Sequence, residues 1–369
     1  MATSGNFVQL HNHTHYSLLD GASKIPDLVK RAKELNMPAV GITDHGNMHG
    51  AYEMWSTAVK EGVKPIIGIE AYVTPETARQ DQTRVSWDTN WNPDIDPQHR
   101  RRNPNDVSGG GLITHLTMWA ETDEGLVNLM KASTDANLEG RVMRYPRMDK
   151  EILAKYSKGI IASSGCPSGI IQTRLLLGQF DEALRAAGEL QDIFGRDNFY
   201  IEFMDHGLKI EKQVTDGLLD IAKKLNAPLL ATNDSHYVRA EDAGSQDAML
   251  CINSGSTLDE PGRFKFDGTG YYLKSAEEMR ELFKDIPEAC DNTLEIAERC
   301  NVMFDDHEDG AFMPQFDCPE GWDETSLFLK KVEEGLERRY DGHPPIEVLK
   351  QADYECGVIC QMQFCGYFL

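Results

Sequence analysis

Apolar and polar positions follow two different periods over the first 240 residues of the chain. In residues 24–36, for example, Ile25, Leu28 and Ala32 recur at the spacing of one helix face, whereas other apolar runs are short and have the length of strands. The expected strands are residues 7–13, 39–45, 65–73, 112–120, 160–165, 199–205 and 228–234, and the expected helices are residues 24–36, 47–62, 124–136, 169–194 and 209–225. About seven alternations of strand and helix predict a parallel, barrel-like α/β domain.

The pattern changes in two later places. Residues 74–110 lack either period, and an insertion of this length without periodicity is usually functional or disordered. Residues 275–303 and 323–340 have the pattern of helices, so we expect a first domain over residues 1–275 and a mostly helical segment over residues 276–369. The apolar run at the end of the sequence, GYFL, indicates a chain cut from a longer one.

Two stretches of the sequence resemble each other. AKELNMPAVGITDH (32–45) and AKKLNAPLLATNDSH (222–236) both pass from a helix end through Leu-Asn and Pro into an apolar strand that ends in Asp and His. In α/β barrels the loops at the carboxyl ends of the strands converge on one face. We therefore expect the polar residues of both stretches at the same rim of the barrel.

Composition limits the classes of function. The 37 Lys and Arg against 60 Asp and Glu give a net charge of −23, which argues against phosphate binding over the whole surface and leaves room for a local site. The eight cysteines are too sparse for a disulfide framework. Because the sequence has neither a run of about 18 apolar residues nor a secretory signal pattern, we expect a cytoplasmic protein with no membrane contact.

Residue types that bind metal ions gather at the expected strand ends. Imidazole, carboxylate and thiolate groups together suit zinc or another borderline divalent ion. The candidate ligands are His11, His13, Asp20, His45, Glu70, His115, Cys166, Asp234 and His236. Taken singly, His115 could be an ordinary buried histidine and Cys166 a small core residue. Their recurrence at successive strand ends favours a metal centre.

Further polar residues follow the expected strand 199–205. These residues are Glu202, Asp205 and His206. They could orient metal ligands by hydrogen bonding to them without binding the metal ion themselves. Capping of the turn at Gly207 is the simpler interpretation.

Several motifs in the sequence resemble those of a known protein family. HNHTHYSLLDG, GITDHGNMHG, GIEAYVTP, THLTMWA, SSGCPSG and NDSHY resemble the successive motifs of the PHP (polymerase and histidinol phosphatase) domain. RFKFDGTGYYLKSAEEM (263–279) and the terminal CGYFL resemble the N-terminal part of the bacterial replicative polymerases of the DNA polymerase III alpha-subunit family. The resemblance implies a distorted seven-stranded (β/α) barrel of PHP type over residues 1–275, followed by a mostly helical segment that opens the polymerase palm.

The resemblance also implies a cluster of three divalent metal ions, which could be zinc, manganese or iron. His11, His13, Glu70 and Asp234 would hold one ion. Glu70 would bridge to a second ion held with His115 and Cys166. Asp20, His45 and His236 would hold the third.

The activity implied by the resemblance is metal-dependent hydrolysis of a phosphodiester at a DNA primer 3′ end, a proofreading 3′–5′ exonuclease. Glu70, Asp20 and Asp234 are the expected catalytic carboxylates, and the insertion residues Arg100, Arg101 and Arg102 could bind the DNA backbone. The parent would be a DNA-directed DNA polymerase, a nucleotidyltransferase that works in DNA replication with a sliding clamp and a clamp loader. Its polymerase aspartates are expected downstream of this chain.

Two alternatives stay open from the sequence. A stand-alone phosphatase of the same superfamily, acting on a small phosphomonoester, would use the same ligands. The second alternative is a non-catalytic scaffold or docking domain of the polymerase, since some relatives have lost metal ligands. The complete set of nine ligand types disfavours the scaffold, and the segment after residue 275 disfavours the phosphatase.

Overall fold

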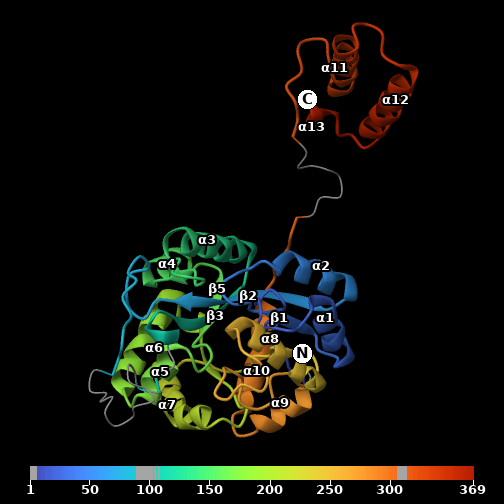
Figure 1. Cartoon of the computed structure of the whole chain (residues 1–369). Helices are drawn as coiled ribbons and strands as arrows, with labels where there is room; N and C mark the ends of the chain where they lie inside the picture. Colours follow the sequence, from blue (N-terminus) through green and yellow to red (C-terminus); the bar gives the residue numbers. More distant parts are fainter. Residues whose placement is uncertain (1–5, 89–102, 104, 107–108, 306–313) are drawn as a thin grey trace. The chain divides into compact units, whose positions relative to one another are not determined.

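The computed structural model describes residues 6–88, 103, 105–106, 109–305 and 314–369. The chain forms two compact units, Met1–Phe304 and Asp305–Leu369, which are described one at a time (Figure 1). The expected domain boundary after residue 275 falls inside the first unit. Helix α10 (Pro287–Arg299) packs against strand β7 (Leu229–Ala231), so the residues directly after 275 belong with the barrel.

The first unit is built on one curled sheet, which has seven strands in the described residues. The strands are β1 (Ala39–Ile42), β2 (Lys64–Val73), β3 (Thr114–Ala120), β4 (Arg147–Met148), β5 (Ile160–Ser163), β6 (Phe199–Phe203) and β7. Their order is β1-β2-β3-β5-β6-β7, with the short β4 paired to β2. The expected α/β barrel is thus confirmed, although the sequence did not predict β4.

The extended segment 7–14, expected as the first strand, closes this sheet. It forms isolated parallel bridges to both edges, from Gln9 to Val40 of β1 and from Asn12 to Ser235 after β7. The Gly41 amide donates to the Gln9 carbonyl over 2.8 Å, and the His13 amide donates to the Ser235 carbonyl over 2.7 Å. The N-terminal segment therefore joins the first strand to the last.

The prediction of an all-parallel sheet is wrong at β3, which runs antiparallel to both β2 and β5. A parallel connection needs a crossover element, usually a helix, to return the chain to the other end of the sheet. In the described part of residues 74–113 the only helical element is the three-residue turn Gly109–Gly111, so the chain comes back along β2 from the same end.

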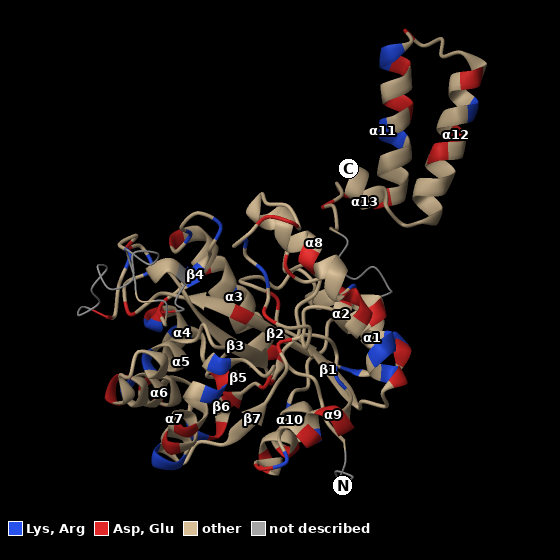
Figure 2. Ribbon diagram, turned by 60° about the horizontal axis from the view of Figure 1, so that its bottom comes forward, with Lys and Arg blue, Asp and Glu red and all other residues tan. Residues whose placement is uncertain are grey.

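Ten α-helices of the first unit's described residues lie around the sheet (Figure 1). They are α1 (Ile25–Glu34), α2 (Ala51–Glu61), α3 (Asp123–Glu139), α4 (Lys150–Tyr156), α5 (Ile170–Leu176), α6 (Phe180–Phe194), α7 (Lys209–Leu225), α8 (Ala243–Ser254), α9 (Ala276–Leu282) and α10. The helix expected over residues 169–194 is divided in two because Gly178 has φ +73°, a left-handed conformation that ends a helix. Charged residues of both signs are distributed over these helices (Figure 2).

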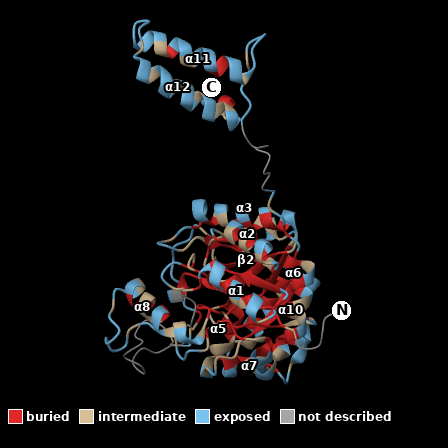
Figure 3. Cartoon of the chain, turned by 90° about the vertical axis from the view of Figure 1, so that its right-hand side faces the viewer, coloured by how far each residue is buried: buried red, intermediate tan, exposed pale blue. Residues whose placement is uncertain are grey.

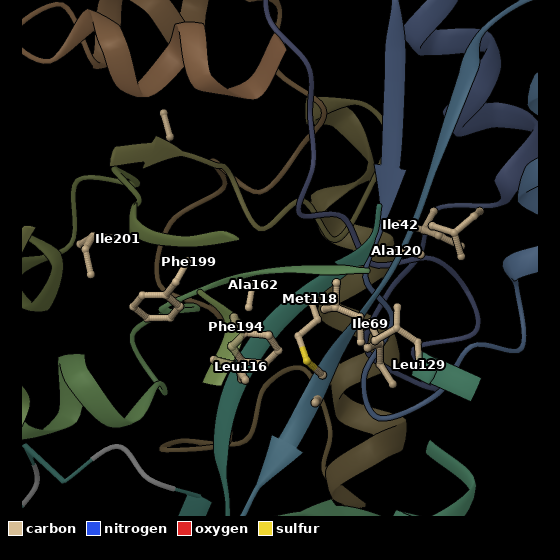
Figure 4. Close-up of a cluster of buried hydrophobic side chains, with 14 of the residues drawn as sticks. Ile42, Ile69, Leu116, Met118, Ala120, Leu129, Ala162, Phe194, Phe199 and Ile201 are labelled. Carbon is tan, nitrogen blue, oxygen red and sulfur yellow. The ribbon is translucent and has the colours of Figure 1, made fainter. Parts of the chain in front are cut away.

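Side chains alternate between the two faces of each strand, and both faces are buried in the central strands (Figure 3). Along β3, Leu116, Met118 and Ala120 join the larger hydrophobic core on the helix side. Figure 4 shows this core, with residues Ile42, Ile69, Leu116, Met118, Ala120, Leu129, Ala162, Phe194, Phe199 and Ile201 labelled. The alternation leaves His115, Thr117 and Trp119 on the opposite face of β3.

Trp119 belongs to a second, smaller core together with Leu10, Ile66 and, from α10, Ile296. The indole is fully buried, and its Nε1 donates to the Leu10 carbonyl over 3.0 Å. Through this bond and the packing around it, the second core anchors the N-terminal segment against β3 and α10.

The second unit consists of α11 (Glu324–Arg339), α12 (Ile346–Gln361) and α13 (Cys365–Phe368). Asp323 caps α11 by accepting a hydrogen bond from the Ser326 amide over 2.7 Å. Helix α11 was expected over residues 323–340, whereas α12 was not predicted. None of the helices in the described parts of the chain combines the length and apolar character needed to cross a bilayer.

We expect Trp119→Ala to lower the free energy of unfolding by about 3–5 kcal/mol, because it removes a large buried side chain and leaves a cavity. Leu138→Ala, at an exposed position of α3, should change the same quantity by less than about 0.5 kcal/mol. Urea denaturation followed by circular dichroism measures both variants. Equal effects of the two substitutions would contradict the packing role of Trp119.

Candidate metal centre

All nine candidate ligands lie close together at one rim of the barrel. The N-terminal segment carries His11 and His13, and the loop that follows it carries Asp20. Other ligands lie on or just after strands: His45 after β1, Glu70 on β2, Cys166 after β5, and Asp234 and His236 after β7. His115 is at the start of β3, but because β3 runs antiparallel and His115 pairs with Tyr72 near the end of β2, it reaches the same rim.

Four of these residues form a compact group. His11 Nε2 lies 3.4 Å from Glu70 Oε1 and 3.4 Å from Asp234 Oδ1, while His13 Nε2 lies 3.6 Å from Glu70 Oε2 and 3.1 Å from Asp234 Oδ1. Ligand atoms at bond lengths of about 2.0–2.2 Å from a tetrahedral ion are about 3.3–3.6 Å apart. The spacing of the four side chains therefore fits one divalent ion.

The remaining ligands extend from Glu70 in two directions. His115 Nδ1 is 3.1 Å from Glu70 Oε1 and 3.4 Å from Cys166 Sγ. On the other side, His45 Nδ1 is 2.6 Å from Glu70 Oε2, and His45 Nε2 is 3.0 Å from Asp20 Oδ2. His45 thus lies between Glu70 and Asp20, nearer to Glu70 than the expected grouping implied.

His236 completes this side of the cluster. Its Nε2 is 3.9 Å from Asp20 Oδ1, and its ring stacks on that of His13 with centroids 4.3 Å apart. Nitrogen atoms of His13, His45 and His236 lie within 4.8 Å of one another, as do ligand atoms of His45, Glu70 and His115.

The hydrogen-bonding state of these residues tests whether a metal ion fits. Buried polar groups in folded proteins are almost always paired. Within the part of the chain that the structure describes, several buried ligand atoms have no hydrogen-bond partner. They are His11 Nε2, His13 Nε2, Asp20 Oδ1, His45 Nδ1, Glu70 Oε1, Glu70 Oε2 and Asp234 Oδ1. Divalent cations would satisfy this set of unpaired nitrogen and oxygen atoms, so the residues fit the expected group.

In His11, His13 and His236 the other ring nitrogen is paired, which orients the free one. His11 Nδ1 is 2.7 Å from Glu202 Oε1, and the same carboxylate accepts hydrogen bonds from the hydroxyls of Ser163 and Thr232. A carboxylate only accepts when ionised, so His11 donates through Nδ1, and Nε2 is the nitrogen that faces the cluster. Glu202 therefore orients a ligand, whereas the sequence favoured a turn cap.

His13 and His236 are oriented in the same way. His13 Nδ1 lies 2.9 Å from the Ser17 hydroxyl, which donates to Asp44 over 2.6 Å, and His236 Nδ1 lies 2.8 Å from the Asp234 carbonyl. Asp205, in contrast, caps the turn as expected by accepting from the Gly207 amide.

Electrostatics keeps His13, Glu70 and Asp234 in the forms that bind a cation, whereas at His11 a cation competes with a proton, because, against the effect of burial, Asp234 and Glu202 raise the pKa of this imidazole. Burial, reinforced by the positive charges of His45 and His236, lowers the pKa of His13 to about 3, so its imidazole stays neutral at neutral pH. Burial opposes ionisation of Glu70 and Asp234, but the adjacent histidines hold the pKa of both carboxyls well below the usual range. Neutral imidazole and ionised carboxylate are the forms that bind metal ions.

The loop after β7 is held by a distant part of the first unit. Asp234 has φ 45°, a left-handed conformation that side chains with a Cβ seldom adopt and that is found at functional sites. Next to it, Asn233 Nδ2 donates to the carbonyls of Gly270 and Tyr272, and the His236 amide donates to the Tyr271 carbonyl. Residues 270–272, within the family-like motif 263–279, thus hold the two ligands in place.

A cleft of about 380 Å³ opens beside the cluster. Its lining includes Asp20, His45 and Tyr72, together with Arg141 and Arg144. These two arginines were not predicted as site residues from the sequence, because nothing in the pattern of residues 139–147 places them at the end of a strand. The expected substrate-binding residues Arg100, Arg101 and Arg102 lie outside the described residues.

We expect Glu202→Gln to weaken metal binding by about 10–100-fold, because the amide no longer fixes the His11 tautomer as the carboxylate does. Asp205→Asn, three residues along the chain, changes a carboxylate that accepts a hydrogen bond from the Gly207 amide and does not contact His11 in the described residues; it is the matched control and should leave metal affinity unchanged. A competition titration with a metal-binding dye measures both affinities. Unchanged affinity in Glu202→Gln would refute the orienting role.

Comparisons with known proteins agree with this site. The PHP domain model matches residues 9–206. The chain is 50% identical over all of its 369 residues to the DNA polymerase III subunit alpha of Mycobacterium tuberculosis, and 38% identical over 376 aligned positions to that of Borreliella burgdorferi. It spans about 30% of the length of each relative.

Among solved structures, an amidohydrolase from Chromobacterium violaceum matches 63% of this chain and 88% of its own. Its TM-score of 0.40 and 14% identity are too low to support an argument. The match of the PHP model covers more than half of the chain and includes seven of the nine candidate ligands. The chain therefore belongs to the PHP domain family.

Proposed function

We propose that this chain is the metal-dependent phosphoesterase region of a DNA polymerase III alpha subunit and that it removes nucleotides from the 3′ end of a DNA primer. The observation that carries the proposal is the group of buried, unpaired ligand atoms around Glu70. Family membership and the 50% identity to alpha subunits support the phosphoester chemistry and the polymerase setting.

The geometry of Glu70 suggests how the site would act. Its Oε1 faces His11 and His115, and its Oε2 faces His13 and His45, so this carboxylate can serve two adjacent cation positions. Bound divalent ions supply electrophilic stabilisation of the charge that develops on a phosphoryl group. Glu70, Asp234 and Asp20 would hold them, with Asp20 at the cleft through which substrate would enter.

We propose that the site binds three ions, held by the ligands that the resemblance implies. Whether these ions are zinc, manganese or iron depends on the coordination geometry and on the supply of each metal. Four anionic ligands, namely Asp20, Glu70, Asp234 and the Cys166 thiolate, are outweighed by three divalent ions. The filled site would therefore attract phosphate within a chain of net charge −23.

The rest of the proposal concerns the whole protein. The polymerase aspartates would lie outside this chain, which spans about 30% of its relatives. Residues 1–275 would form the PHP phosphoesterase domain, and residues 276–369, of which α9 and α10 pack with the barrel, would lead into the palm. DNA, a sliding clamp and a clamp loader would be its partners in replication.

The test combines elemental analysis with a primer-shortening assay. We expect up to three metal ions per chain and removal of a mismatched nucleotide from the 3′ end of a labelled primer. Chelation should stop the reaction, and added metal should restore it. His13→Ala or Asp20→Ala should reduce the rate by at least about 100-fold, since each removes a ligand. His343→Ala, at an exposed position of the second unit, is the matched control and should keep full activity.

Two results would contradict the proposed activity. Hydrolysis of small phosphomonoesters without attack on DNA would identify a phosphatase. Bound metal without either activity would identify a scaffold or docking domain.

A further inference from the structure

The cleft beside the metal centre is lined by two kinds of residue. Asp20 and His45 are candidate metal ligands. Arg141 and Arg144, from the segment between α3 and β4, line the cleft without belonging to the ligand set. The cleft of about 380 Å³ is within the usual range of small-molecule sites, about 300–1,000 Å³.

The charge of this cleft differs from that of the chain. Among the described residues that line it, Asp20 is the one carboxylate, and Asp20 is an expected metal ligand. With that carboxylate bound to a cation, the two guanidinium groups leave the cleft positively charged in a protein of net charge −23. Such a local field favours an anionic ligand.

Arg144 is held in position by a neighbouring helix. Its Nη1 donates to Asn253 Oδ1 of α8 over 2.6 Å, and its guanidinium lies 5.3 Å from the centroid of the Tyr145 ring. Asn253 Nδ2 in turn donates to the Leu19 carbonyl over 3.2 Å. Because Leu19 directly precedes Asp20, Asn253 connects the arginine to the loop that carries a metal ligand.

We propose that Arg144, with Arg141 beside it, binds a second phosphate of the substrate, upstream of the phosphate that reacts at the metal centre. The inference rests on the proposed function and specifies its substrate class. A guanidinium binds phosphate oxygens through two parallel hydrogen bonds. A small monoester has one phosphate, which would occupy the metal centre, whereas a nucleic-acid strand brings the further phosphates that these arginines can bind.

The experiment measures binding of short fluorescent oligothymidylates to the metal-loaded chain by anisotropy. Each probe has a non-hydrolysable methylene phosphonate at its 3′-terminal linkage, and its upstream linkages are either charged phosphodiesters or uncharged methylphosphonates. We expect the wild type to bind the charged probe at least about tenfold more tightly. Arg144→Ala should lose about tenfold in affinity for the charged probe and nothing for the uncharged one.

Two further variants sharpen the test. Arg144→Lys keeps the charge without the forked geometry and should retain part of the preference. Arg196→Ala removes an exposed arginine just before β6, at the end of that strand away from the ligands, and should bind both probes as the wild type does. The dependence of affinity on salt should weaken in Arg144→Ala by about 0.7 in logarithmic slope, the effect of losing one contact to a single strand.

The outcomes separate this inference from the proposed exonuclease. A wild type that prefers the charged probe through Arg144 but leaves a natural primer intact would support the inference and refute the exonuclease. A wild type that shortens primers while Arg144→Ala keeps the full preference for the charged probe would overturn the inference alone. Equal losses on both probes would also overturn it, because they would indicate a structural effect.

Discussion

The backbone pairing of the N-terminal segment with both edges of the sheet is the constraint on which the metal centre depends. Gln9 and Asn12 bridge to β1 and to the segment after β7, and the alternation of an extended chain then places His11 and His13 on the same side. Without this pairing, the two histidines would have no fixed position relative to Glu70 and Asp234. The buried indole of Trp119, which donates to the Leu10 carbonyl, strengthens the same closure.

The closed barrel brings together groups that are costly to bury. Glu70 is almost fully buried, both of its oxygens lack hydrogen-bond partners in the described residues, and its neighbours are imidazoles. Unpaired buried polar atoms reduce stability, and proteins keep them mainly where function requires them. The large apolar core on the helix side of the sheet supplies the stability that lets the other face hold such a cluster.

Much of this arrangement was predictable from the sequence, because the sequence directly gives the spacing of apolar residues and the positions of residue types that bind metal ions. The helix α7 begins and ends at the predicted residues 209 and 225, and all nine candidate ligands lie at one rim. The direction of β3 was not predictable from its pattern, since an apolar strand reads the same in either direction. An orienting role for Glu202 was considered from the sequence but not favoured over turn capping, because its contact with His11 joins residues 191 positions apart.

The reversed direction of β3 has a consequence for access to the rim. Because β2 ends and β3 begins there, the connection between them leaves and returns beside the metal centre, at Val73 and Thr114. The register of Tyr72 with His115 is fixed by the strand pair itself and does not depend on how long that connection is. Insertions and deletions in this hairpin loop can therefore reshape the approach to the rim that carries the candidate ligands over evolution, while the ligand geometry stays constant.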